Sequence, residues 1–514
     1  MICPMKLLKA MATVAGLTGL SRIAGFIRDI LTAAILGTGP IADAFFVALK
    51  LPNLFRRITA EGAFSVSFVP LYSEALEKDG QASADEFAGQ ALSGMAVTLA
   101  LFSVLAMLCM PWIIMGIAPG FAQDEIRYDL AVTLAQITFP YLLLISVTAL
   151  FGGILNAHNK FAPFAAAPVL FNLSLITALL LSFVFFPTSG HAMAWGVFGA
   201  GFLQCGFLYY FIRKNGYCIR LGRPVWNPRI KKLLLLMGPG VIGAGVVQIN
   251  LFADMIIASF LDTGAISVLY YADRLNQLPL GMIGIAIGTT LLPMLSRALS
   301  SDDTLEARKL FNRALEICLV IGLPAAAGLF IIAQPIISLL FERGAFTAEA
   351  AIQTATVLKM YVIGLPAYVI IKVYSAAFWS RQDTVTPVKI AVLGTLLNIA
   401  MGLIFIFALG YGVEGIALAT SIAGWVQLFC LAFALRGEKD MILEPLFYSR
   451  LMRIVLSVVV MAISLYAANL YLIDLALLPR VLIFVFGAKI IYAASIMLTG
   501  AVNMEDVKLI SKKQ

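Results

Sequence analysis

Charged residues interrupt the first long apolar run of the sequence. The stretch SRIAGFIRD, residues 21–29, places Arg22, Arg28 and Asp29 inside an apolar run that covers residues 7–36. If this run crosses a membrane, each charge at the bilayer centre costs about 2.5–3.5 kcal/mol, so such residues almost always face protein or a water-filled cavity. Arg22 and Asp29 are seven residues apart and therefore share one face of a helix. Because the planar fork of arginine suits phosphate oxygens, this pattern predicts a site for an anion such as a diphosphate.

Two further apolar stretches carry the same kind of charge. Residues 41–72 contain Asp43, Lys50, Arg56, Arg57 and Glu61, and residues 266–296 contain Asp273 and Arg274. Helical spacing places Asp43, Lys50 and Arg57 on one face. One interpretation is that these charges form structural ion pairs or snorkel to the interface. The other is a ligand site, which is favoured for Arg22, Arg28 and Arg274 because these cations together outnumber the nearby acids.

The sequence lacks the residue patterns of nucleotide-binding, metal-binding and catalytic sites. There is no G-x-x-x-x-G-K-[ST] motif, and GPGVIG at 238–243 opens an apolar helix without a preceding strand, which argues against a dinucleotide site. The two histidines, His158 and His191, lie beside loops and form no H-E-x-x-H motif. SDDT at 301–304 is interpreted as a helix cap or solvated loop rather than as a magnesium-diphosphate site. With no nucleophile–base pair and no metal cluster, the chain is predicted to be a transporter, not an enzyme, without a resident cofactor.

The composition is that of a polytopic membrane protein. Of 514 residues, 61% are hydrophobic and 12% are charged, and the charged share is about half that of an ordinary soluble domain. Runs of at least about 20 apolar residues recur, which suffices to cross a bilayer as helices, and the alternating pattern of a membrane barrel is absent. The formal charge of +8 gathers in one class of loop, which indicates positive-inside topology rather than nucleic-acid binding. The six cysteines form no C-x-x-C pair and are expected to be buried thiols.

Hydropathy predicts an all-α polytopic fold with fourteen transmembrane helices. The predicted spans are 7–36, 41–72, 87–117, 128–155, 162–187, 192–212, 232–261, 266–296, 309–340, 349–379, 387–409, 413–435, 449–472 and 478–500. The loops after even-numbered spans hold most of the loop lysines and arginines, so both termini are expected in the cytoplasm.

The chain also repeats itself weakly at an offset of about 224 residues. FFVALKLPNL at 45–54 resembles LYYADRLNQL at 269–278, and FAPFAAAPVLFN at 161–172 corresponds loosely to TVTPVKIAVLGTLLN at 384–398. Asp29 falls over Asp254 within one residue. Because the offset covers six spans, the two halves share one orientation, as in parallel repeats around an axis along the membrane normal.

The repeat predicts the domain organisation. Residues 1–218 are expected to form an N-terminal lobe, residues 219–440 a C-terminal lobe, and residues 441–514 two additional helices with a cytoplasmic tail. The two six-helix lobes are expected to face each other across a central cleft that the cations of the second and eighth spans approach from opposite sides.

Three of the stretches together resemble the MurJ (MviN) lipid II flippase family of the MOP exporter superfamily. They are SRIAGFIRD, DAFFVALKLPNLFRRITAEGAFSVSFVP at 43–70 and YYADRLNQLP at 270–279. The resemblance covers essentially the whole chain and includes SRQDTVTPVKIA at 380–391. It implies two six-helix lobes in a V around a cationic cavity, with two extra helices that form a hydrophobic groove for a polyprenyl tail.

The resemblance also assigns roles to residues. The essential, substrate-binding arginines of the family fall on Arg22, Arg28, Arg56 and Arg274. Its motif is matched by Asp29, Asp43, Lys50 and Glu61, and Asp273 completes the supporting cavity charges. Helical periodicity alone favours Arg57 over Arg56, but Pro52 interrupts the helical phase and the family match favours Arg56. The chain departs from the family at Gln277, where related proteins often carry Glu.

A sodium site of the family would fall on Asp254, Asn398 and Thr420. The position of its second carboxylate is Gly402 in this chain. Coupling of transport to Na⁺ is therefore left open by the sequence.

The predicted function is translocation of lipid II, an undecaprenyl diphosphate-linked disaccharide pentapeptide, to the outer leaflet of the bacterial inner membrane by alternating access. Membrane potential is expected to help by resetting the cationic cavity. The expected partners are lipid II, membrane lipids and proteins of cell-wall synthesis. The alternatives are an exporter of a drug or of another lipid-linked oligosaccharide, a membrane enzyme acting on polyprenyl diphosphates, and a division or wall scaffold, which leaves the buried cations unexplained.

Overall fold

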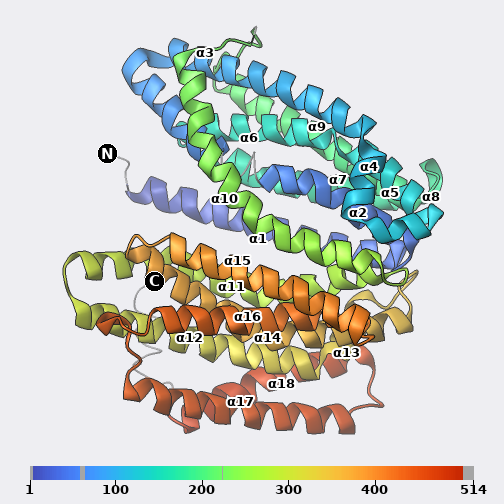
Figure 1. Cartoon of the computed structure of the whole chain (residues 1–514), viewed down its shortest axis with the longest axis vertical. Helices are drawn as coiled ribbons and strands as arrows, with labels where there is room; N and C mark the ends of the chain where they lie inside the picture. The colour runs from blue at the N-terminus through green and yellow to red at the C-terminus, as the bar shows by residue number, and fades with distance from the viewer. Residues whose placement is uncertain (1–3, 58–63, 223, 502–514) are drawn as a thin grey trace. The chain divides into compact units, whose positions relative to one another are not determined.

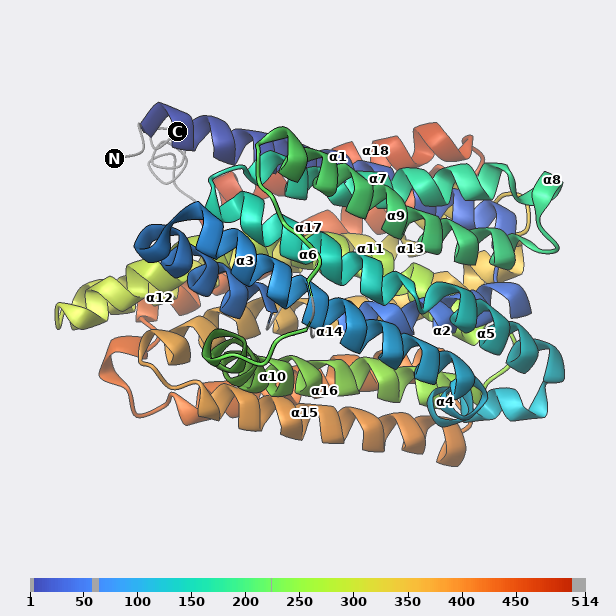
Figure 2. The same ribbon diagram turned by 90° about the horizontal axis from the view of Figure 1, so that it is seen from above.

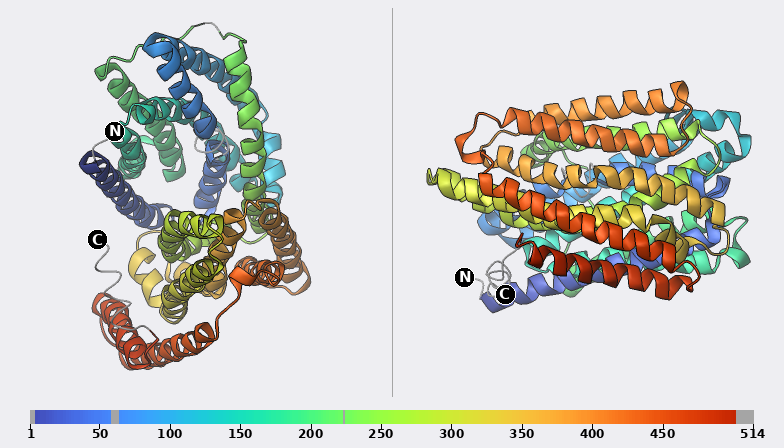
Figure 3. Two further views of the ribbon diagram at one scale, coloured as in Figure 1. Left: turned by 90° about the vertical axis from the view of Figure 1, so that its left-hand side faces the viewer. Right: turned by 90° about the horizontal axis from the view of Figure 1, so that it is seen from below.

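The computed structural model describes residues 4–57, 64–222 and 224–501, and these residues are almost wholly helical, without a strand among them. The helices divide into two compact units (Figure 1). The right view of Figure 3 shows the helices of the second unit running side by side and roughly parallel, whereas the green helix Pro228–Ser259 is tilted across its neighbours in the left view. This confirms the predicted all-α fold class.

Unit 1 comprises residues 1–267 and 343–346. Its helices are α1 (Pro4–Leu36), α2 (Pro40–Phe55), α3 (Phe64–Leu108), α4 (Met110–Ile117), the 3₁₀ turn η2 (Pro119–Gln123), α5 (Glu125–Thr138), α6 (Tyr141–Ala157), α7 (Phe161–Leu180), α8 (Ser182–Phe185), α9 (Ser189–Lys214), α10 (Pro228–Ser259) and the first turn of α11 (Ala265–Ser300). α7 packs between α1 and α9, as Figure 2 shows. The approach of α9 to α7 is close because a Cβ at Gly196 would lie only 2.7 Å from the Cβ of Ala178.

Local sequence explains where the helices of unit 1 bend and begin. α3 is interrupted at Gly80, whose φ of 82° and ψ of 177° suit glycine and break the helix into two parts. The part of α3 before Gly80 contains the end of the predicted span 41–72, and the part after Gly80 contains the beginning of the predicted span 87–117. α10 begins at Pro228 because the Asn227 side chain accepts a hydrogen bond from the Ile230 N–H at 2.9 Å, and proline has no N–H to leave unpaired in the first turn.

Unit 2 comprises residues 268–342 and 347–514. It contains the rest of α11, α12 (Thr304–Ile331), α13 (Ala333–Phe341), α14 (Ala348–Ser380), α15 (Val385–Leu403), the π turn η3 (Ile404–Ala408), α16 (Glu414–Ala434), the 3₁₀ turn η4 (Lys439–Met441), α17 (Pro445–Tyr471) and α18 (Leu477–Leu498). α14 packs against α12 and α16, and α17 packs against α18 and α12. An ion pair of 2.7 Å between Arg450 and the buried Glu316 fastens the start of α17 to α12.

Ten helical segments are long and apolar enough to span a membrane within the described chain. They include α3, α12 and α14, and their outward side chains are strongly apolar, as in Leu101 at 67% exposed and Ile463 at 65%. Exposed apolar faces of this extent mark a multi-pass membrane protein. Each of the fourteen predicted spans coincides with helix, but the first, second, seventh and eighth fall outside the ten, so the number fourteen stays a prediction.

The packing of α10 groups this helix differently from the sequence repeat. α10 contacts α3, α4 and η2 and belongs to unit 1, whereas the sequence repeat counts it as the first helix of the second lobe. Packing and internal repetition are different properties of the chain. The repeat-based lobes therefore stay a prediction.

Candidate functional site

Arg28 and Asp29 form a buried ion pair on α1. The Arg28 side chain bends back so that its Nη2 lies 2.6 Å and its Nε 3.1 Å from Asp29 Oδ1. The exposed fractions are 9% for Arg28 and 1% for Asp29. A charge-assisted pair of this geometry holds the guanidinium in one orientation and offsets its charge inside the helix bundle.

Asn172 on α7 completes this cluster. Its Oδ1 accepts from Arg28 Nη1 at 3.0 Å, and its Nδ2 donates to the carbonyl oxygens of Ser21 and Pro168, both at 3.1 Å. The amide therefore fastens α1 to α7 and orients the arginine at the same time. The Phe171 ring lies 5.9 Å from the Arg28 guanidinium carbon. Sequence reasoning did not assign Asn172 a role, although it ends the repeated stretch 161–172.

Arg22 differs from Arg28 although both lie on α1. Its side chain is exposed, and so are those of its neighbours Ile23 and Ile27, at 61% and 47%. Among the residues whose side chains the structure describes, Arg22 makes no hydrogen bond or ion pair. An arginine in this state is available to an external anion, whereas the guanidinium of Arg28 is held in place by its partners.

Asp43 is fully buried and binds backbone N–H groups. Its carboxylate accepts from the Gly264 N–H at 2.7 Å, the Ser267 N–H at 2.9 Å and the Ser267 hydroxyl at 2.5 Å. Ser267 lies in the first turn of α11 and Gly264 directly precedes that helix, while Asp43 itself sits in the first turn of α2. The acid therefore satisfies orphan donors at one helix N-terminus and meets the favourable dipole of another.

Arg127 is a second residue that the sequence did not reveal. Its Nη1 lies 3.9 Å from Asp43 Oδ2 and donates to the Leu261 carbonyl at 3.3 Å, while its Nε donates to Asp124 at 2.7 Å. The Phe121 ring lies 4.8 Å from its guanidinium carbon. The sequence gives no sign of this role, because Asp43 and Leu261 lie far from Arg127 along the chain.

Three tight turns pack against one another near Asp43. Gly37, Gly264 and Gly344 have φ values of 64°, 101° and 59°. A Cβ at Gly344 would lie 2.2 Å from the Ala34 carbonyl oxygen. The same oxygen accepts a hydrogen bond from the Ala345 N–H at 2.8 Å. Since only glycine tolerates both the backbone angles and the approach, these turns are joined main chain to main chain.

The charged residues of the predicted stretch 41–72 make separate contacts on and near α2. Lys50 Nζ donates to the Leu251 carbonyl of α10 at 3.2 Å, and Arg56 Nε donates to the Asn53 side chain at 3.2 Å. Arg56 is half-buried and Arg57 is exposed. Glu61 lies outside the described residues.

In unit 2, the third stretch lies on α11. Asp273 and Arg274 are both half-buried, and the Gln277 side chain donates a hydrogen bond to the Asp273 carboxylate. Gln277, at the position where the family often has an acid, thus serves as a neutral donor to Asp273.

The predicted sodium ligands are distributed over both units. Asp254 lies on α10 in unit 1, and Asn398 and Thr420 lie on α15 and α16 in unit 2. Asn398 is 2% exposed. The Thr420 hydroxyl donates to the Ile416 carbonyl at 3.0 Å, which leaves its oxygen lone pairs as acceptors.

The fold defines the class of protein. A solved structure described as the inward-facing conformation of a multidrug resistance MATE family transporter of the MOP superfamily matches with a TM-score of 0.70, covering 84% of this chain and 98% of that chain. At 14% identity this likeness shows the fold alone. The chain is a polytopic helical membrane protein with the fold of the MOP superfamily transporters.

The family follows from more specific similarity. Residues 32–486 match the model of the family described as lipid II flippase MurJ. The probable lipid II flippase MurJ of Rhizobium meliloti (strain 1021) is 41% identical over 470 residues, which cover 90% of this chain and 86% of the relative. A solved structure of lipid II flippase MurJ in an inward closed conformation is 30% identical, with a TM-score of 0.76 and coverage of 94% of this chain and 98% of that chain.

The chain therefore belongs to the lipid II flippase MurJ family. Members of this family are transporters, so the chain is a transporter and not an enzyme. The resemblance read from the three sequence stretches is confirmed.

Proposed function

We propose that this chain translocates lipid II from the cytoplasmic to the outer leaflet of the bacterial inner membrane by alternating access. Family membership supports the substrate and the transport class. The observation from the structure that carries the proposal is the contrast on α1 between exposed Arg22 and the Arg28–Asp29–Asn172 cluster. Arg22 supplies an accessible cation, and the cluster holds a second cation with a fixed orientation.

The diphosphate of the substrate is the group these cations bind. Guanidinium forks make paired hydrogen bonds to phosphate oxygens, and partial neutralisation by Asp29 keeps Arg28 from binding so tightly that release becomes slow. Arg56 and Arg274 stay predicted members of the same set, with Lys50 and Asp273 as supporting charges.

The turns at Gly37, Gly264 and Gly344 follow odd-numbered predicted spans, so the positive-inside rule favours an outer location for them and a cytoplasmic location for both termini. A tag at either terminus that is reached only after cell lysis tests the orientation.

The polyprenyl tail stays in lipid beside α17 and α18. Their outward side chains are apolar and exposed, for example Leu456 at 55% and Ile490 at 69%. Such a surface keeps a long isoprenoid chain in contact with protein and lipid while the polar head group crosses.

The direct test measures the fraction of lipid II exposed on the outer face of cells depleted of their own flippase. Cells carry this chain or its Arg22→Ala variant at matched membrane levels, and Arg213→Ala, which removes an exposed arginine from the last turn of α9, is the control. Wild type and the control are expected to restore exposure, and Arg22→Ala is not. If the wild-type chain fails to restore it, the proposed function is wrong; if Arg22→Ala restores it, Arg22 has no part in the pathway.

The driving force is proposed to be membrane potential, because one charge crossing 100 mV is worth about 2.3 kcal/mol. Flipping by purified protein in vesicles should rise with an imposed potential that is negative inside. Sodium coupling through Asp254, Asn398 and Thr420 is tested in the same vesicles by exchanging Na⁺ for choline, and an unchanged rate contradicts it.

A further inference from the structure

The linker between α9 and α10, residues 215–227, is docked on α3. The Asp85 carboxylate accepts a hydrogen bond from the Cys218 N–H at 2.9 Å. The Ser93 hydroxyl accepts one from the Gly222 N–H, also at 2.9 Å. Both acceptors are buried side chains of α3, so the linker is fastened by its main chain.

The spacing of these contacts explains why the linker follows the helix. Between them, a Cβ at Gly89 would lie 2.4 Å from the carbonyl oxygen of Arg220. The α3 positions are thus four residues apart, which is about 6 Å of helical rise. The linker positions are two residues apart, which is about 6.6 Å of extended chain. The two repeats match, so residues 218–222 of the linker stay in register along α3.

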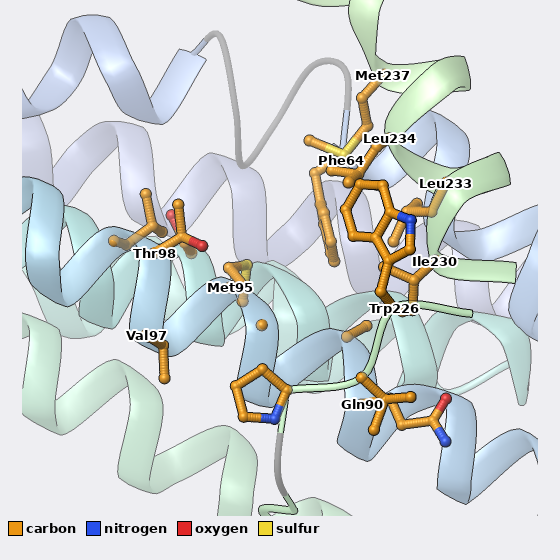
Figure 4. Close-up of a pocket in the computed structure, with 16 residues that line it drawn as sticks. Phe64, Gln90, Met95, Val97, Thr98, Trp226, Ile230, Leu233, Leu234 and Met237 are labelled. Carbon is orange, nitrogen blue, oxygen red and sulfur yellow. The ribbon is translucent and has the colours of Figure 1, made fainter. Parts of the chain in front are cut away.

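A cavity lies where the linker leaves α3. It has a volume of about 370 Å³ and is enclosed by α3, α6, the start of α10 and the end of the linker. Figure 4 shows Met95 and Thr98 of α3 on one side and Trp226, Leu233 and Met237 on the other. None of the residues that line it is charged. It is separate from the charged residues of α1 and α2, none of which lines it.

One polar group inside the cavity wall is unsatisfied. Ser146 of α6 lines the cavity, is 1% exposed, and its Oγ has no hydrogen-bond partner among the described residues. A buried hydroxyl is normally paired, so a partner from a ligand gains more here than at an exposed position. Gly94 of α3 also lines the cavity, and a Cβ at this position would meet no atom within 4 Å.

We propose that this cavity binds an uncharged, lipid-soluble molecule that carries one hydroxyl or carbonyl group, and that its occupancy holds the linker against α3. The apolar wall selects an apolar body, the lack of charge on the wall disfavours ions, and Ser146 selects one hydrogen-bonding group. This is the composition of small-molecule sites, which are mostly apolar with a few polar groups. Because the walls belong to α3, α6, the linker and α10, a ligand that contacts all four segments stabilises their association.

The test uses a medium-chain alcohol that carries a photoreactive diazirine, 3-azioctanol, on the full-length purified protein. Labelling is expected to saturate, to be competed by 1-octanol, and to fall on peptides that contain Met95, Trp226 or Met237. Labelling that rises linearly with concentration and spreads over the lipid-facing helices would mean partition into the apolar surface and would overturn the proposal.

Gly94→Leu fills the cavity and is the main variant. Each buried methylene is worth about a fourfold factor in affinity, so displacing two or three of them predicts about 16- to 64-fold weaker labelling. Gly206→Leu is the matched control, because Gly206 is an exposed glycine of α9 whose Cβ also meets nothing within 4 Å and which does not line the cavity. Equal labelling of both variants contradicts the assignment of the site.

Ser146→Ala tests the polar group without adding volume. It is expected to weaken labelling by the alcohol about fivefold, the worth of one hydrogen bond, and to leave unchanged the labelling by the matching diazirine alkane. Amide hydrogen exchange of residues 218–227 is the second readout. The alcohol should slow it in wild type and not in Gly94→Leu; no change in wild type contradicts the coupling to the linker. These measurements involve no lipid II, so they succeed or fail independently of the transport function.

Discussion

Asp29 and Asp43 are both buried acids of unit 1, and they accept hydrogen bonds from different kinds of donor. Asp29 accepts two hydrogen bonds from the side chain of its neighbour Arg28. Asp43 accepts from the main chain of Gly264 and Ser267, 221 and 224 residues away. Asp29 therefore orients the guanidinium of Arg28, and Asp43 fixes the position of the start of α11.

The comparison shows that the charges in this membrane protein have two separate tasks. Sequence alone presents them as one set of costly residues. In the structure, Asp29 together with Asn172 prepares a cation, whereas Asp43 together with Arg127 joins segments. A third buried acid, Asp85, belongs to the second group because it accepts from the Cys218 N–H.

The largest expected effect is loss of stability in Asp43→Ala. The substitution leaves the N–H groups of Gly264 and Ser267 without their acceptor and removes the carboxylate 3.9 Å from the buried Arg127 guanidinium. Breaking a buried pair in this way costs about 3–5 kcal/mol. Thermal unfolding of the purified protein in detergent measures it. Asp129→Ala, which removes an exposed acid of α5, is the control and should leave the unfolding temperature unchanged. An Asp43→Ala protein as stable as this control would remove Asp43 from the joining group.

A smaller loss is expected for Asp29→Asn. The carboxamide keeps the shape but removes the charge that offsets Arg28, and hydrogen bonds to charged groups are worth about 1.5–3 kcal/mol. Lipid II exposure should also fall, because the guanidinium loses its orientation. Asp129→Asn is the matched control for both measurements. Lowered stability with normal exposure would show that Asp29, like Asp43, is purely structural.

A pH effect is expected at His158, beside the acid that holds the linker. Burial lowers the pKa of the His158 ring below its ordinary value of 6.5, against a smaller opposing effect of Asp85. Its Nε2 lies 3.1 Å from Tyr72 Oη and its ring stacks on Tyr217 at 4.2 Å.

The sign follows from which state binds the proton first. The unfolded chain takes it up near pH 6.5, before the folded one does, so this contribution to stability is present above that pH and is lost as the pH falls below it. The unfolding temperature is compared between pH 8 and pH 5.5 in wild type and in His158→Asn. The variant should lose less stability on acidification; an identical loss would exclude His158 as the cause.

The smallest effect on stability is expected for Arg22→Ala. The side chain is exposed and makes no hydrogen bond or ion pair with the residues whose side chains the structure describes. The unfolding temperature should therefore match that of wild type, while lipid II exposure is lost. Arg28→Ala should lower both. If the two variants behave alike in unfolding, the distinction between an available and a held cation does not apply to α1.

Much of the fold was predictable because a membrane helix is indicated by a run of apolar residues that are neighbours in the sequence. Within the described residues, each predicted span falls mainly on helix, since each span needs a run of apolar residues. The ends were harder to place: the sequence predicts a loop at 73–86, where α3 is helical apart from the break at Gly80. The packing of α10 with unit 1 depends on its contacts with α3 and η2, which hydropathy does not contain.

The candidate site was predictable in its charged members and not in their partners. Arg22, Arg28 and Asp29 stand out because charges are costly in apolar runs. Asn172 and Arg127 do not, because an asparagine in a helix and an arginine beside a loop are ordinary residues in sequence. One signal pointed to Asn172, namely that the stretches ending at Asn172 and Asn398 repeat, as do Asp29 and Asp254.

The sequence by itself determined the class of protein, the helices and the family, because hydropathy and motif identity are properties of neighbouring residues. Only the tertiary structure decided which charges are paired, which acid holds a cation and which holds a helix, and where the linker leaves a cavity on α3. Those outcomes depend on atoms brought within about 3 Å by packing, the range over which hydrogen bonds form. Residues more than a hundred positions apart meet at that range, and no local pattern along the chain records which of them will do so.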